Sequence, residues 1–380
     1  MKIIVNKIDK KKTKKRKIWW YGILAVCYLF AIIFVVNDTW LYQMPVVRVK
    51  QIVTTEAGTE QGTRGTDVKK YTQKMTGNIL NGTHKGETVE VTSTYTETEM
   101  LNQKYRKGDC VFLDGTIEDP GTAIRGMKRD SYLVVMIGFL ILTLVIIAGK
   151  QGMLIILTLI MNIFIFMIGF SHSGNLTDIL SVCNKMVIAF AIVTLFCLNG
   201  CNKKTVSALL STLCVLAMVM TVFSLVVHHT EELDFSTMEY LDLRSIDNPE
   251  EIFYAEILLS GLGAIMDVAV DISTALSEII KQKPEISFRQ LFRSGREIGH
   301  DIMGTMINIL LFVFISGLIP MCLIRMNNDV SFLTIIRLHI PCELCRFFVE
   351  SIGIVLAIPV SVLITSGILK SNLKKRTMLC

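Results

Sequence analysis

Asp267 and Asp271 stand four residues apart in GLGAIMDVAVDISTALSEI, residues 261–279, a stretch that is otherwise apolar enough to enter a bilayer. On a helix this spacing places both carboxylates on one face. Two neighbouring acids disfavour double ionisation, so the pair can share one proton or hold one cation. We therefore take Asp267 and Asp271 as a candidate site for ion or proton coupling, and we add Glu256 and Glu278 from the same face.

These four acids belong to a polar stripe along a helix predicted over residues 252–280. A carboxylate at the centre of a bilayer costs roughly 2.5–3.5 kcal/mol, while each Leu, Ile, Val or Phe returns only about 0.3–0.6 kcal/mol. We therefore expect the stripe to face a partner helix or a water-filled cavity. The structural alternative is that the acids only pair with basic residues of the bundle. At 100° per residue the stripe spans an arc of about 80° and comprises Glu256, Ser260, Gly263, Asp267, Asp271, Thr274 and Glu278.

The composition is that of an integral membrane protein. Apolar residues make up 51% of the 380-residue chain, charged residues 19%, and the mean hydropathy is +0.51. Eight apolar stretches approach or exceed the roughly 18–20 residues that a bilayer crossing needs. The fold class predicted is mainly α, with eight transmembrane helices in contact with the lipid bilayer. The stretches are residues 18–36, 131–149, 152–170, 176–198, 206–227, 252–280, 302–323 and 342–369.

Basic residues near the span ends predict the orientation. The leader, residues 1–17, has nine Lys and Arg against one acid, which indicates a cytoplasmic N-terminus. Eight crossings then bring the tail, residues 370–380, to the same side. The first span, residues 18–36, is longer than the apolar core of about 7–15 residues in a cleaved signal peptide, so we expect it to be retained. The seven later spans form one transmembrane domain, residues 131–369.

Residues 40–130 form the one section with a soluble character. The segments VVRVKQIVTT, ETVEVTSTYTET and CVFLDGTI have the β-branched enrichment of strands, and NGTHKGE and RKGD supply Gly-based turns. We predict a small extracytoplasmic β-rich domain, either a β-barrel of the OB-fold kind or a β-sandwich. It contains one cysteine, Cys110, so it has no internal disulfide, and it shows no basic stripe for nucleic acid. We interpret it as a docking or gating domain.

The seventh predicted span carries polar residues along one side. Asp301, Thr305 and Asn308 recur at helical spacing, and Gly304 is expected to allow the close approach of another helix. Before this span, SFRQLFRSGREIGHD looks amphipathic. It is predicted either to lie on the anionic inner leaflet or to be a simple basic loop that fixes the topology.

The last predicted span begins with Glu343, Arg346 and Glu350 on one face. Arg346 is the natural counter-ion for an acid inside the bundle. Pro359 should kink the helix and leave one carbonyl without its helical partner. We predict that the last three spans share a polar interior, with the path lined by Asp301, Thr305, Asn308, Glu343, Arg346 and Glu350.

Three segments in this order resemble the YibE/YibF family of bacterial multipass membrane proteins: GLGAIMDVAVDI, LFRSGREIGHDIMGTM and ESIGIVLAIPVSVL. The resemblance implies a bacterial plasma-membrane location and agrees with the predicted topology, but it supplies no substrate. A weaker likeness links the acidic helix and the segment that follows to the proton-coupled helix pair of resistance-nodulation-division exporters, where Asp267 and Asp271 would match the proton-carrying acids. This second likeness is an analogy of arrangement.

Two functions fit these patterns. The first is a secondary transporter or export component that moves a small substrate with a proton or cation. The second is a non-transporting scaffold or sensor that binds a membrane or envelope protein through its outer β domain. An intramembrane aspartyl protease using Asp267 and Asp301 ranks third. The chain has no nucleophile elbow, HExxH zinc motif or phosphate-binding Gly loop. We therefore expect no enzyme, no metal site and no cofactor.

Overall fold

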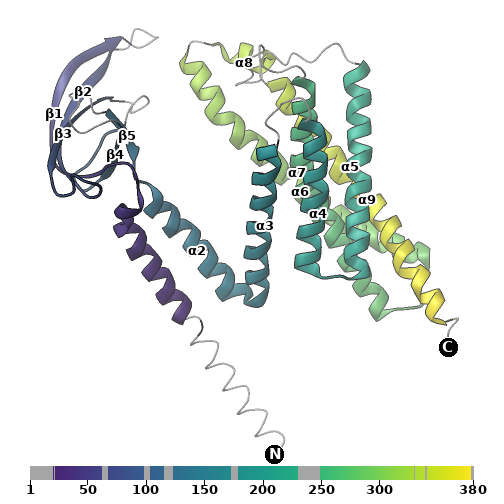
Figure 1. The fold of residues 1–380 in the computed structure, drawn as a ribbon. Coiled ribbons are helices and arrows are strands. Elements are labelled where there is room, and N and C mark those ends of the chain that lie inside the picture. The colour runs from purple at the N-terminus through teal and green to yellow at the C-terminus, as the bar shows by residue number, and fades with distance from the viewer. Residues whose placement is uncertain are drawn as a thin grey trace, which may run out of the picture. The chain divides into compact units, whose positions relative to one another are not determined.

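The computed structural model describes residues 20, 22–61, 67–97, 103–114, 123–172, 179–229, 249–328, 330–338 and 340–377, and the predicted leader lies outside these residues. Within the described chain, eight helices are long and apolar enough to cross a membrane, as the sequence predicts (Figure 1). A ninth helix, α8 (Phe332–Leu338), is too short to cross and was not predicted. The long helices are the first span (Gly22–Leu41), α2 (Asp130–Ala148), α3 (Lys150–His172), α4 (Ile179–Asn199), α5 (Lys203–His229), α6 (Pro249–Gln282), α7 (Phe288–Asn327) and α9 (Ile340–Thr377).

The chain divides into two compact units, Met1–Met153 and Leu154–Cys380. The first unit contains a five-stranded antiparallel sheet with the strand order β3-β2-β1-β4-β5. The edge strands β3 and β5 also contact each other, so the sheet curls toward a barrel rather than forming two packed sheets. Its strands are β1 (Val46–Gln61), β2 (Asp67–Ile79), β3 (Thr88–Thr96), β4 (Cys110–Asp114) and β5 (Ala123–Met127).

The predicted Gly-based turns are confirmed. Gly82 and Gly86 take positive φ angles of 79° and 96° between β2 and β3, and Gly108 takes 100° just before β4. Alternate residues of the strands point inward, as the burial pattern of β3 shows. They build a small apolar core of the sheet's own, comprising Val47, Val49, Met75, Ile79, Val89, Val91, Tyr105, Val111 and Leu113.

The first span packs against α2 within the same unit. The Tyr28 hydroxyl donates a 2.7 Å hydrogen bond to the Val135 carbonyl. The Tyr28 ring fills the space where a Cβ of Gly138 would stand, so the glycine lets the two helices approach closely.

The second unit is a helix bundle whose centre is formed by α6 and α9. Ile265, Val268 and Ile272 on α6 and Ile354 and Val362 on α9 are fully buried, at 0% exposure. Helices α4, α5 and the beginning of α7 pack around this pair. Helix α9 contacts four helices, α5, α6, α7 and α8. The predicted kink residue, Pro359, lies inside α9, and the helix continues past it to Thr377.

Residues 288–301, predicted either to lie on the anionic inner leaflet or to be a simple basic loop, form the first turns of α7 and are therefore not a loop. One 40-residue helix runs from Phe288 to Asn327 and starts with a capping box between Ser287 and Gln290. Leu291 is 0% exposed and packs in the bundle core. Leu291 therefore contacts other helices of the bundle, which neither sequence interpretation anticipated, whereas Phe288 is exposed.

The close approach expected at Gly304 occurs earlier along α7. A Cβ at Gly295 would lie 2.8 Å from Val362 Cγ2, and one at Gly299 would collide with Ile358, both on α9. A Cβ at Gly304 would meet nothing within 4 Å. The expectation at Gly304 was wrong because the small-xxx-small pair in GREIG already provides the contact.

This contrast gives a matched pair of variants. We expect Gly299→Leu to lower the free energy of unfolding by about 3 kcal/mol, because the new side chain must push Ile358 out of a packed contact. Gly304→Leu adds the same side chain in open space and should leave stability unchanged or raise it through helix propensity. The thermal midpoint of helix loss, followed by circular dichroism in detergent, measures both. Equal midpoints for the two variants would contradict the packing described here.

Candidate functional site

Polar side chains join α6 and α9, which run parallel. Arg346 on α9 bonds Glu256 on α6, and Ser260 bonds Glu350. In both pairs the residue numbers differ by 90. Nearer the other end of the helices the Ser273 and Thr365 hydroxyls are 3.0 Å apart, with a difference of 92. The nearly constant difference shows two helices side by side in one register.

Arg346 is the centre of a charge cluster between these helices. Its guanidinium forms an ion pair with Glu256 and a second one with Glu343, where Arg346 Nη2 lies 2.5 Å from Glu343 Oε2. The three side chains are only 25–37% exposed. The expectation that Arg346 serves as counter-ion is met, since it pairs with an acid of the α6 stripe.

Glu350 lies one helical turn after Arg346 on α9 and is 7% exposed. The Ser260 hydroxyl donates to its carboxylate, and Gly261 brings the α6 backbone close, with a Cβ there standing 4.0 Å from Glu350 Cγ. A carboxylate this deep needs donors, because burying an unpaired charge is costly. Ser260 and the nearby Arg346 therefore hold Glu350 in place as part of the helix contact.

Asp267 and Asp271 lie elsewhere. Both are on the exposed side of α6, whereas Val268, Ala269 and Ile272 on the other side are fully buried. Within the described residues neither aspartate makes a hydrogen bond or an ion pair, and Arg346 is paired with other acids. These two acids consequently do not hold the bundle together.

The depth of Asp267 follows from the length of α6. The helix has 34 residues, 249–282, and a bilayer core of about 30 Å takes up roughly 20 of them. The first such window ends at residue 268 and the last begins at residue 263. Asp267 falls within every window. A bilayer crossing by α6 would therefore include Asp267 among its roughly 20 residues wherever the crossing begins.

The predicted stripe is thus divided into two parts. Glu256 and Ser260, toward the start of α6, are engaged by α9, whereas Gly263, Asp267, Asp271 and Thr274 are exposed. Glu278, near the end of the helix, pairs with Lys281 at 3.1 Å and is also exposed.

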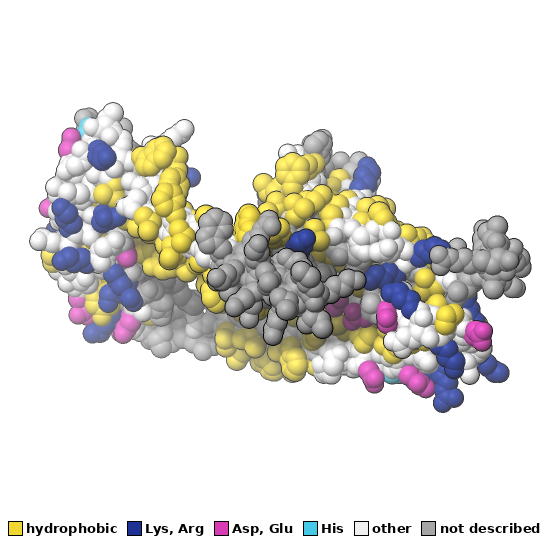
Figure 2. Space-filling model, turned by 90° about the horizontal axis from the view of Figure 1, so that it is seen from below, with side chains coloured by type: hydrophobic (Ala, Val, Ile, Leu, Met, Phe, Trp, Pro, Cys, Tyr) yellow, Lys and Arg dark blue, Asp and Glu magenta, His cyan; other side chains and the backbone are white. Residues whose placement is uncertain are grey.

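We call the end of the bundle where α5 begins and α6 ends the lysine-rich end, because Lys203, Lys281 and Lys283 are exposed there. Figure 2 views the molecule from below and shows dark-blue basic side chains interspersed with acidic and hydrophobic ones. Glu278 belongs to this end. The open part of the stripe therefore leads from the lysine-rich end to Asp267.

The three polar residues predicted on α7 do not join the Arg346 cluster. Asp301, Thr305 and Asn308 are exposed. Thr305 Oγ1 donates to the Ile302 carbonyl at 2.8 Å, and Asn308 Nδ2 donates to the Gly304 carbonyl at 2.7 Å, both within α7 itself. The packed polar contact lies between α6 and α9, not among three helices as expected, because α7 turns its glycine face to α9 and its polar face outward.

Sequence reasoning missed two contributors to the helix contacts. The glycine pair of GREIG could have been found from its small-xxx-small spacing. The buried pair of Ser273 and Thr365 could not, since single hydroxyls are common in membrane helices and only the register of α6 on α9 brings these two together.

Comparison with known proteins identifies the family. A model described as YibE/F-like protein matches residues 136–371, and one described as YibE/F family N-terminal domain matches residues 40–127. The first match alone covers more than half of the chain, so the chain belongs to the YibE/F-like family. Together with the apolar helices, this membership fits a membrane protein. No curated protein and no solved structure matches the chain.

The two parts of the stripe should differ in their effect on stability. Arg346→Met leaves Glu256 and Glu343 without their cation, so we expect the free energy of unfolding to fall by about 1–3 kcal/mol, the partial exposure of the cluster reducing the cost below that of a fully buried pair. Asp267→Asn and the control Arg289→Met, both at exposed positions, should leave it unchanged. Thermal unfolding of the purified variants in detergent measures this. If Asp267→Asn destabilised the protein as much as Arg346→Met, the division of the stripe into a packed part and an exposed part would be contradicted.

Proposed function

We propose that this YibE/F-like protein is a secondary transporter or export component of the bacterial plasma membrane, with both termini cytoplasmic. Asp267 and Asp271 bind the coupling proton or cation, and the substrate is a small molecule. The proposal assigns no catalytic residue and no cofactor to the chain.

One observation carries the proposal. Asp267 falls within every window of about 20 residues along α6, yet its side chain makes no contact that would hold helices together. A carboxylate at the centre of a bilayer costs roughly 2.5–3.5 kcal/mol and needs compensation. The Glu256–Arg346–Glu343 cluster shows what a structural role looks like in the same bundle, and Asp267 lacks it. Ion binding would account for an acid at position 267 that makes no ion pair or hydrogen bond to another helix.

The division of the stripe suggests how the two ends of the path differ. Ions enter from the lysine-rich end, pass Glu278 and Asp271 and reach Asp267 along the open face of α6. Toward the other end, the Arg346 cluster and Glu350 close the contact between α6 and α9. Transport then requires this contact to open while the Asp267 region closes. The proposal requires water or polypeptide, rather than acyl chains, against the open face.

Removal of the charge tests the site. The purified protein is placed in sealed vesicles that contain a pH or cation indicator. When a proton or cation gradient is imposed, the unmodified chain should carry that ion into the vesicles, and the indicator gives the initial rate. Asp267→Asn should lower the initial rate by about tenfold or more, since proton binding is lost while the fold is kept. Asp271→Asn should lower it less, because one carboxylate remains.

Glu285→Gln is the matched control, because Glu285 is an exposed acid in the turn after α6. Its rate should equal that of the unmodified chain. If Asp267→Asn together with Asp271→Asn leaves both the uptake and the phenotype of a complemented deletion strain intact, the proposal is wrong.

A scaffold or sensor is the second candidate, favoured by the independent core of the sheet. In this case the aspartates are dispensable once stability is matched, and deletion of residues 45–125 abolishes function. Complementation by the double aspartate variant separates the two candidates, since the transporter requires these carboxylates and the scaffold does not.

A further inference from the structure

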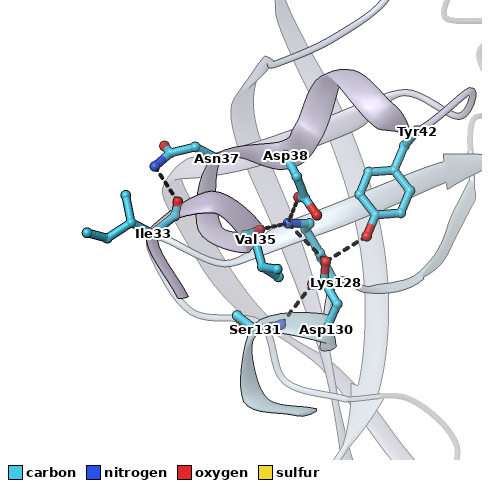
Figure 3. A network of polar contacts seen from close by, with 8 residues as sticks. All are labelled: Ile33, Val35, Asn37, Asp38, Tyr42, Lys128, Asp130 and Ser131. Atoms are coloured by element: carbon cyan, nitrogen blue, oxygen red, sulfur yellow. Dashed lines mark hydrogen bonds and ion pairs between the residues drawn. The ribbon is translucent and has the colours of Figure 1, made fainter. Parts of the chain in front are cut away.

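A second buried charge cluster lies where the sheet meets the membrane helices of its unit (Figure 3). Lys128, directly after β5, reaches three oxygens. Its Nζ donates to the Val35 carbonyl at 2.5 Å, lies 2.5 Å from Asp38 Oδ1 and lies 3.1 Å from Asp130 Oδ2. Val35 and Asp38 belong to the end of the first span, whereas Asp130 opens α2. One ammonium group thus ties together three segments that are far apart in sequence.

The cluster is shielded from solvent. The side chains of Lys128 and Asp38 are 5% and 8% exposed, and that of Asp130 is 27% exposed. Burial alone would lower the pKa of Lys128, but the hydrogen bonds to Asp38 and Asp130 outweigh it, and the net pKa is raised. Lys128 therefore stays charged at neutral pH and keeps its bonds to both carboxylates.

Tyr42 extends the cluster into the sheet. Its hydroxyl donates to Asp130 Oδ2 at 2.6 Å, and its ring meets the ring of Phe112 on β4 edge to face, with the centroids 5.1 Å apart. Asn81, in the turn after β2, donates to the Tyr42 carbonyl at 2.8 Å and accepts from the Val46 amide at 2.7 Å. Lys128 also lies over the Tyr42 ring, 5.5 Å from its centroid. Directional contacts therefore run without a break from the sheet to both helices.

The connections around the cluster are short. Four residues, 42–45, separate the first span from β1, and two residues, 128 and 129, separate β5 from α2. Tyr28 holds the two helices together further along, through its bond to Val135. A domain that is merely tethered would need longer, mobile linkers.

We propose that Val35, Asp38, Tyr42, Lys128 and Asp130, together the Lys128 joint, make the sheet, the first span and α2 one rigid body, so that a ligand or partner that displaces the sheet moves both helices with it. The joint is built from groups at the ends of the connecting segments, and none of its members belongs to the apolar core of the sheet. The joint goes beyond ion coupling and serves either candidate function.

Spin-label distances in the full-length protein test the joint. Labels introduced as non-natural amino acids at Lys74 of β2 and Ile147 of α2, both exposed, report on the sheet and the helix. We expect a narrow distance distribution in the background chain and one about twofold wider or more in Lys128→Met, because both carboxylates lose their cation. Arg129→Met, the exposed neighbouring residue, should keep the narrow distribution.

Tyr42→Phe is a milder second variant that tests the joint even if Lys128→Met fails to fold, since it removes only the hydrogen bond to Asp130. It should widen the distribution to a smaller extent. Hydrogen exchange of Val47, Ile79 and Val91 amides should remain slow in both variants, because the sheet keeps its own core. Unchanged widths in Lys128→Met and Tyr42→Phe, or a sheet that loses protection together with the joint, would overturn the proposal.

Discussion

A charge removed from water must meet a partner, and this constraint separates the charged residues of the chain into two kinds. Arg346 satisfies it for Glu256 and Glu343 between α6 and α9. Lys128 satisfies it for Asp38 and Asp130 between the sheet and its helices. In both clusters a single cation joins two carboxylates from separate segments, which is strong in a setting of low dielectric only when the geometry is good.

Asp267 and Asp271 are the other kind, because α6 exposes them while it buries its opposite side. The helix therefore has two surfaces with different tasks. Its apolar side and the polar residues of its first turns pack against α9. Its polar face, with Asp267 and Asp271, is exposed. A bundle that needed these acids only for cohesion would place them against Arg346 or another base, as it does with Glu256.

Much of this could be predicted from the sequence, and the rest depended on long-range register. The eight long helices follow from the lengths of the apolar stretches, and the turns at Gly82, Gly86 and Gly108 follow from local chemistry. Arg346 was identified as counter-ion because few bases lie within the spans. Arg346 pairs with Glu256 because α9 lies beside α6 with an offset of 90 residues. No local sequence pattern encodes that offset.

The same reason explains what was missed. Lys128 and Asp38 are separated by 90 residues and meet only after the sheet has folded between them. The amphipathic pattern of residues 288–301 does not reveal that Leu291 is buried in the bundle core, because the same pattern suits a packed helix and a surface helix. The sequence analysis placed the close approach at Gly304, and only the direction in which α7 presents each glycine to α9 shows that the contact is at Gly299.

Water access to the face that carries Asp267 tests the central claim most directly. Gly263→Cys places a thiol on this face, and Phe164→Cys on α3 places one on an exposed apolar surface. With a water-soluble thiol reagent applied to the protein in nanodiscs, and the labelled peptide identified by mass spectrometry, we predict rapid labelling of Gly263→Cys and little of Phe164→Cys. Equal protection of both thiols would mean that water does not reach this face of α6, and the proposed entry of ions to Asp267 would be contradicted.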